Sequence, residues 1–304
     1  MGRVRSAGEA GVRPAVSGPC LADAMPSPGY DPTFLAAPAP LPVPPPPVVV
    51  RELAFTHFTV LLQPDRRLAL ATAVNLDGAE LLDLGRGDDW HLEPRVPAEE
   101  QVGPELYADN DLDRGHLVRR RDPVWGDPEV AAQANLDTFS YVNAAPQAAL
   151  FNQGELLWLG LEDYVLTHAD VNDLRLSVFT APVLAPGDPV YRGVQIPRRF
   201  WKVAAWAAVG EGGVPVLAAT AYLLDQSEVL DPLLQSAAGP PPLGGYLTYQ
   251  VPVADVAALT GLDLGPLVAA DRLPDPGPVT VDGVGPVEPG ERWARLDQPS
   301  DVVL

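Results

Sequence analysis

Residues 111–123 read DLDRGHLVRRRDP, a stretch that is unusual for the chain that contains it. Arg114 and the run Arg119–Arg121 lie here beside His116, one of only four histidines, in a chain of 304 residues with a formal net charge of −20. Two interpretations are open. The arginines form a solvated turn, or they belong with His116 to a site that handles an anion.

The overall charge limits the partners that this stretch could serve. A net charge of −20 argues against broad, non-specific docking on nucleic acid. It leaves room for a small basic cleft in an acidic shell. Arg114 and Arg119–Arg121, set against Asp113 and Asp122, give a local charge of +4 − 2 = +2 beside His116.

Length and composition indicate an ordinary folded protein. The 304 residues suffice for one large domain or two small ones, and the apolar fraction of 47% is typical of soluble proteins. We find no apolar run long enough to span a membrane and no apolar segment behind the basic N-terminus, so we expect no secretory signal. The single cysteine, Cys20, excludes an internal disulfide framework. We therefore expect a cytoplasmic protein, with export by another route left open.

The chain divides into three parts by composition. Residues 1–48 form a Pro-rich arm that ends in a polyproline-like run, residues 49–272 form the main domain, and residues 273–304 form an irregular tail. The arm is either disordered or anchored on the domain by GYDPTFL at residues 29–35, and it could also bind a protein partner or inhibitor.

Hydrophobic periodicity predicts an α+β domain with a mixed sheet and helices. Strand-like runs flank a QPDRR turn in residues 58–78, and another ends at a proline turn in residues 138–146. A buried helix is expected over residues 151–170. Three further strands are predicted in residues 174–184, 200–210 and 214–225, and helices broken at Gly261 and Gly265 are predicted in residues 251–271.

Five polar residues follow one another at the edges of these segments: Arg114, His116, Asn143, Asn152 and Glu162. A neutral imidazole can take a proton from water, and an arginine can bind a phosphate through two parallel hydrogen bonds. An asparagine oxygen is a hard, neutral ligand for Mg²⁺, and a carboxylate can orient the waters of the ion. These are the parts needed for metal-assisted hydrolysis of a phosphodiester.

Each of these residues also has an ordinary structural interpretation. His116 could be a turn histidine, Asn143 a strand-end residue and Asn152 a helix cap. Arg119–Arg121 could be a solvated run. We interpret the remaining histidines as structural or surface residues: His57, His91 and His168.

The motifs change this balance, because their order resembles that of a known family. DRGH at residues 113–116 is followed by TFSYVNAAPQ and then by FNQ and LE, as in the DNA/RNA non-specific endonucleases of the endonuclease G-like, ββα-metal group. The resemblance extends from about Phe58 to Gln226. It implies the ββα-metal nuclease fold, with a central, mostly antiparallel sheet and flanking helices.

The resemblance also implies a division of labour in a nuclease that acts on DNA and RNA. His116 would be the general base, and Asn152 would be the only protein ligand of one Mg²⁺, with Mn²⁺ as a possible substitute. Glu162 would fix one of the waters of the metal. Arg114 would help to neutralise the phosphate, and Asn143 would support the site.

Further arginines are expected to contact the phosphates of the substrate. The family has one such arginine upstream of its DRGH motif, and Arg95 is slightly favoured over Arg86 for that role. We expect Arg119, Arg120 and Arg121 to contribute mainly to substrate affinity.

One departure from the family pattern bears on the metal site. Asn152 and Glu162 are 162 − 152 = 10 residues apart, whereas the family usually has a spacing of eight. We expect the excess to lie between Gln153 and Trp158, which leaves Glu162 on the side of the metal. Otherwise Glu155 takes its role. The same departure favours the alternative of a degenerate member that binds nucleic acid or protein without cleavage.

Overall fold

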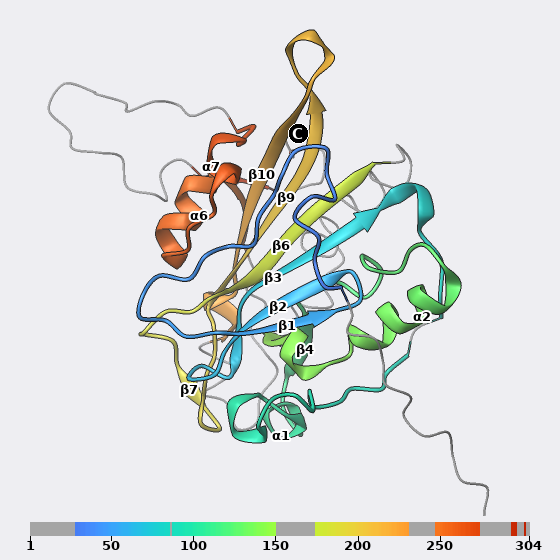
Figure 1. Cartoon of the computed structure of the whole chain (residues 1–304). Coiled ribbons are helices and arrows are strands. Elements are labelled where there is room, and N and C mark those ends of the chain that lie inside the picture. Colours follow the sequence, from blue (N-terminus) through green and yellow to red (C-terminus); the bar gives the residue numbers. More distant parts are fainter. Residues whose placement is uncertain are drawn as a thin grey trace, which may run out of the picture.

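A computed structural model describes residues 28–85, 87–149, 174–230, 247–273, 293–296 and 301. Its centre is an eight-stranded sheet in which every neighbouring pair is antiparallel (Figure 1). In spatial order the strands are β1 (Arg51–Phe55), β2 (Phe58–Gln63), β3 (Leu68–Asp77), β6 (Arg175–Val183), β9 (Arg199–Val209), β10 (Pro215–Asp225), β11 (Leu247–Val251) and β12 (Ala294–Arg295). The expected α+β class and antiparallel sheet are confirmed.

In the described part of the chain, two short ribbons and several helices accompany the sheet. The ribbons pair β4 (Leu112–His116) with β5 (Ala144–Ala148) and β7 (Val190–Tyr191) with β8 (Val194–Gln195). The described helices are α1 (Pro104–Tyr107), α2 (Pro128–Asp137), α6 (Val253–Thr260) and α7 (Pro266–Ala269). Within the described part of the chain, no helix combines the length and apolar character needed to cross a membrane.

Most of the predicted strands and helices are found. The hairpin β2–β3 and the strands β6, β9 and β10 lie where alternation placed them. Gly261 ends α6 with a φ of 70°, a left-handed conformation that suits glycine, so the predicted break is confirmed. Residues 138–146 differ from the expectation of one strand, because a 3-10 turn over Tyr141–Asn143 precedes β5. The predicted helix over residues 151–170 lies outside the described residues.

The two faces of the sheet carry separate hydrophobic clusters. Strand alternation distributes neighbouring side chains between them: in β9, Phe200 joins the cluster with Leu117 and Ala145, and Trp201 joins the cluster with Leu267 of α7. The β4–β5 ribbon therefore rests on one face of the sheet, and α6 and α7 cover the other.

The end of the N-terminal arm packs on the face that carries α6 and α7. Tyr30 is 5% exposed, its hydroxyl donates to the Ala39 carbonyl at 2.6 Å, and its N–H donates to the Thr59 Oγ1 at 3.0 Å. The Asp31 N–H donates to Asn75 Oδ1 at 2.7 Å. These contacts attach residues 30 and 31 of the arm to the sheet. Residues 1–27 lie outside the described residues.

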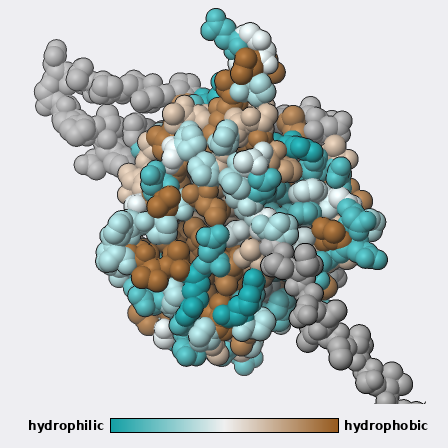
Figure 2. Space-filling view, viewed as in Figure 1, coloured by the Kyte–Doolittle hydropathy of each residue, from teal (hydrophilic) through white to brown (hydrophobic). Residues whose placement is uncertain are grey.

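A hairpin formed by β9 and β10 extends beyond the body of the molecule (Figures 1 and 2). Its tip carries Val209 and Val214, which are 85% and 61% exposed. Elsewhere on the face shown in Figure 2, hydrophilic and hydrophobic residues are interspersed.

The turn between β1 and β2 is fastened by His57, whose φ is 66°. Its ring stacks on Trp125 with centroids 3.6 Å apart, and its Nδ1 lies 2.8 Å from the Pro123 carbonyl oxygen. Because a carbonyl only accepts, Nδ1 carries a proton. Burial lowers the pKa of His57 below its ordinary value of 6.5, although the Pro123 carbonyl, Asp137 and Glu80 act in the opposite direction.

This half-buried imidazole should make stability depend on pH. The unfolded chain binds a proton at His57 more readily than the folded chain, so its contribution is complete above pH 6.5 and is lost as pH falls below that value. We expect the free energy of unfolding in urea to fall more steeply between pH 7.5 and 5 in the wild type than in the His57→Asn variant, because the variant lacks the titrating group. Asparagine is chosen because it tolerates a positive φ. Equal slopes in the two proteins would contradict this role.

Candidate active site

The β4–β5 ribbon brings the DRGH and NAAPQ motifs together. In the antiparallel ladder His116 lies opposite Ala144, and Asp113 lies opposite Gln147. Gln226 fastens the ribbon to the sheet: its Oε1 accepts from the Ala148 N–H at 2.9 Å, and its Nε2 donates to the Pro197 carbonyl at 2.7 Å. Two motifs that are separate in the sequence thus form one structural unit.

Gly115 makes room for a side chain of the partner strand where the two motif strands pair. The buried side chain of Gln147 lies over it, and a Cβ at Gly115 would stand only 2.1 Å from Cδ and 2.2 Å from Oε1 of Gln147. Any larger residue would displace Gln147. The glycine of DRGH thus has a packing reason.

Arg114 and His116 are two residues apart on β4, so their side chains leave the same face of the ribbon. Aromatic rings surround the imidazole: the Trp90 centroid lies 4.7 Å from that of His116, and the Phe139 centroid lies 5.3 Å from it. The Arg114 guanidinium lies over Trp90 at 5.1 Å. Sequence reasoning missed Trp90 and Phe139, and the one available signal was a tryptophan in the polar stretch GDDWHLEP.

Among the described residues, the counter-ion of the Arg114 cation is loosely held. Its Nη2 lies 3.7 Å from Oδ1 of Asp88, and the side chain of Asp88 is 73% exposed. This distance exceeds that of a hydrogen bond, and exposed pairs of this kind contribute little. Arg114 can therefore exchange Asp88 for another anion at small cost.

Asn143 is fully buried and bonds only to the backbone. Its Oδ1 accepts from the Val118 N–H at 2.9 Å, and its Nδ2 donates to the carbonyls of Val118 at 2.9 Å and Thr138 at 3.0 Å. The side chain shapes the chain immediately after His116. These bonds favour a positioning role for Asn143 beside His116, and its place among the catalytic residues stays a prediction.

The arginine run is not a solvated turn, because Arg119–Arg121 are all half-buried. Arg120 donates through Nη1 to the Leu84 carbonyl at 2.9 Å and to Asn135 Oδ1 at 3.2 Å. Its guanidinium is thus partly committed to the fold.

Arg95 is held more tightly still. Its Nε and Nη2 donate to the two carboxylate oxygens of Glu93 at 2.7 and 2.9 Å, and its Nη1 donates to the Ala54 carbonyl at 2.8 Å. Burial alone would raise the pKa of Glu93, but the hydrogen bonds from Arg95 outweigh it and the pKa is lowered. This arrangement favours a structural role for Arg95, and its phosphate contact stays a prediction.

The predicted metal residues lie outside the described part of the chain, together with the alternatives considered for the site: Asn152, Glu162, Glu155, Gln153, Trp158 and Arg86. Among the residues that are described, no group of three or more His, Cys, Asp and Glu is placed to hold a metal ion. A site with one asparagine as its protein ligand needs no such group.

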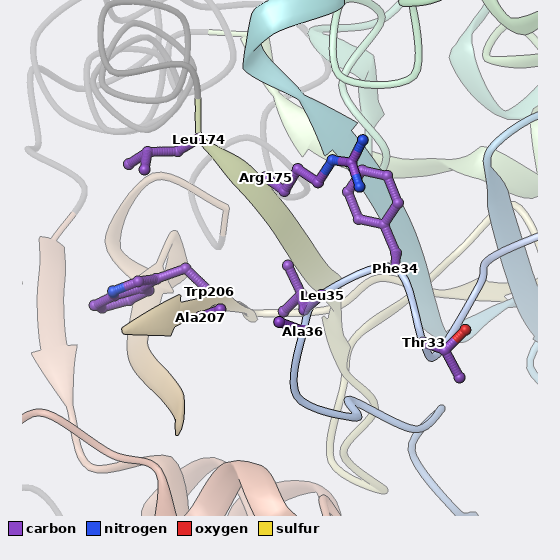
Figure 3. A pocket seen from close by; sticks show the side chains of 8 residues that line it. All are labelled: Thr33, Phe34, Leu35, Ala36, Leu174, Arg175, Trp206 and Ala207. Carbon is purple, nitrogen blue, oxygen red and sulfur yellow. The ribbon is translucent and has the colours of Figure 1, made fainter. Parts of the chain in front are cut away.

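A hollow of about 420 Å³ lies at the ends of β6 and β9, lined by Thr33, Phe34, Leu35, Ala36, Leu174, Arg175, Trp206 and Ala207 (Figure 3). The Arg175 guanidinium lies over the Phe34 ring at 5.1 Å and donates to Asp77 at 2.8 Å. Among the described residues, none of those predicted for the site lines this hollow, and its lining includes no residue of β4 or β5.

Comparison with known proteins first identifies the fold. A chain in the crystal structure of the EndoG/EndoGI complex, which concerns the mechanism of EndoG inhibition, superposes with a TM-score of 0.52 at 17% identity, over 71% of this chain and 86% of that chain. The described architecture is thus that of the EndoG-like nuclease fold.

Sequence comparison then gives the family. The model of the DNA/RNA non-specific endonucleases matches residues 42–271, and the chain belongs to this family. The uncharacterized protein y4fB of Sinorhizobium fredii is 43% identical over 221 residues, which cover 69% of this chain. The match spans only 33% of the length of y4fB.

Packing at Gly115 predicts the effect of the smallest possible side chain. Gly115→Ala should destabilise the protein by about 1–3 kcal/mol in urea unfolding, because the new methyl group overpacks buried Gln147. Gly187→Ala is the matched control, since a Cβ there meets nothing within 4 Å, and it should change stability by less than about 0.5 kcal/mol. Equal stability of the two variants would contradict the packing argument.

The bonds of Asn143 predict a loss of stability as well as activity. Asn143→Ala leaves the buried Val118 N–H without its partner, which should cost about 1–3 kcal/mol. Asn110→Ala is the control: Asn110 also bonds backbone groups, at Leu106 and Leu112, but is half-exposed, so water can replace it at a smaller loss. Full stability of Asn143→Ala with lost nuclease activity would instead indicate a direct catalytic role.

Proposed function

We propose that the chain is a Mg²⁺-dependent nuclease that hydrolyses phosphodiester bonds of DNA and RNA, with His116 as its general base. Membership of the non-specific endonuclease family supports the nuclease activity. The observation that carries the assignment of residues is the β4–β5 ladder, which sets Arg114 and His116 on one face of a ribbon. A base and a phosphate-binding cation thus stand side by side.

His116 has the chemistry and the setting of a base. A neutral imidazole near pH 7 accepts a proton from water, and rings on two sides restrict its motion. Arg114 offers a forked donor to a phosphate oxygen, which would replace the loosely held Asp88. Arg114 would then stabilise the charge that develops on the phosphate.

The proposed metal ligand is Asn152, with Glu162 holding a water beside it. An amide oxygen is a suitable neutral donor for Mg²⁺ or Mn²⁺. The other asparagine of the motifs, Asn143, has both amide atoms bonded to the backbone, which supports Asn152 for this role. When bound, the cation would supply Lewis-acid stabilisation of the phosphate.

Substrate contacts would be made mainly to phosphates, which explains a lack of base specificity. Arg119, Arg120, Arg121 and Arg95 are proposed to contribute affinity, and Arg120 and Arg95 also donate hydrogen bonds to backbone carbonyls of the fold. EndoG forms a complex with EndoGI. A protein partner or inhibitor for this chain, and a cytoplasmic location, remain proposals.

Cleavage of plasmid DNA and of RNA with Mg²⁺ and with EDTA tests this function. We expect activity only with Mg²⁺, and His116→Ala should lower the rate about 100-fold or more while DNA binding and stability change little, as for loss of a general base. Asn152→Ala should abolish cleavage and weaken Mg²⁺ binding. Wild-type activity in EDTA would contradict the metal requirement, and DNA binding without any cleavage would favour the degenerate, non-catalytic alternative.

A further inference from the structure

We propose that Trp90 is a positioning residue of the active site, because its indole holds the Arg114 guanidinium and the His116 imidazole in their working arrangement. This inference rests on the proposed function, since it concerns the same two reacting side chains. The family motifs at residues 113–116 and 143–147 do not include Trp90, and its contacts become apparent only in the fold.

Trp90 contacts both members of the pair. Its ring centroid lies 4.7 Å from that of His116 with the planes inclined by 50°, and the Cζ of Arg114 lies 5.1 Å from the indole centroid. The two β4 side chains point to the same side, so one ring reaches both.

The position of Trp90 is itself fixed. Phe139 meets the indole edge-on with centroids 5.5 Å apart, and Tyr141 lies at 5.6 Å. The neighbouring backbone is bonded to the same segment: the His91 N–H donates to the Phe139 carbonyl at 3.1 Å, and the Tyr141 N–H donates to the His91 carbonyl at 2.9 Å. Because this segment leads directly into β5, the backbone beside Trp90 is attached to the ribbon.

Arg114 needs such a support. A free arginine side chain samples many rotamers, and its ion pair with Asp88 at 3.7 Å is too long to fix it. The negative face of an indole attracts a guanidinium and restricts it to the plane above the ring. His116 is limited in the same way by Trp90 and Phe139. Correct orientation of reacting groups raises the rate of the chemical step more than it raises affinity.

The test uses Trp90→Leu and Trp90→Phe in the full chain, with DNA cleavage measured in Mg²⁺. We expect Trp90→Leu to lower kcat by about 10- to 100-fold with KM changed less than about threefold, and Trp90→Phe to recover most of the loss. The pH profile of kcat/KM in Trp90→Leu should also shift on the limb that reports His116. Wild-type kcat and pH profile in a folded Trp90→Leu protein would overturn the proposal.

The matched control is Tyr191→Leu. Tyr191 also lies under an arginine, with the Cζ of Arg192 5.1 Å from its ring, but that pair includes neither Arg114 nor His116. The Tyr191→Leu variant should keep kcat within about twofold of the wild-type value. An equal loss of kcat in both variants would show that the effect is general destabilisation and would overturn the assignment to Trp90.

Two further measurements keep the inference testable on its own. If Trp90→Leu does not fold, uniform 5-fluorotryptophan, which weakens the negative face of the indole, should lower kcat in the wild type and not in Trp90→Phe. If the wild type does not cleave, the proposed function fails, whereas an NMR titration of His116 still tests the contact. An imidazole titration unchanged by every substitution at Trp90 would overturn it.

Discussion

The backbone ladder between β4 and β5 is the interaction on which the site depends. It pairs the DRGH strand with the strand that carries Pro146 and Gln147. Gly115 leaves room for the side chain of Gln147, which occupies the space that a Cβ at residue 115 would fill. Gln226 then bonds the ribbon to the loop before β9 through the Pro197 carbonyl. The large sheet therefore serves as a support, and the side chains that we propose to react project from a short ribbon laid on it.

Local patterns in the sequence predicted the elements whose stability is local. The β2–β3 hairpin, the alternating strands β6, β9 and β10, and the glycine-ended helix α6 all carry their signals within a few residues. The strand predicted over residues 138–146 failed for a tertiary reason: the buried amide of Asn143 bonds Val118 and Thr138 and draws the chain into a turn. Periodicity within the segment could not show the bond to Val118, which lies 25 residues earlier in the chain.

In the candidate site, too, residues named by a local motif could be predicted, and residues placed by tertiary contacts could not. The identities of Arg114 and His116 could be read from DRGH, because the motif specifies them directly. Trp90 could not, since its contact with His116 depends on backbone bonds between His91 and the segment around Phe139. Arg95 and Glu93 are only two residues apart, so their ion pair could have been predicted from the sequence. The family motifs instead favoured a phosphate contact for Arg95.

Charge explains why this arrangement suits an acidic chain. With a net charge of −20, nearby carboxylates and carbonyls compete for every arginine. Arg95 bonds Glu93 at 2.7 Å on a carboxylate that is 4% exposed, whereas Arg114 faces Asp88 at 3.7 Å on one that is 73% exposed. A phosphate would therefore displace the counter-ion of Arg114 far more easily than that of Arg95. The indole of Trp90, which carries no net charge, can hold Arg114 in place without neutralising the cation that we propose for phosphate binding.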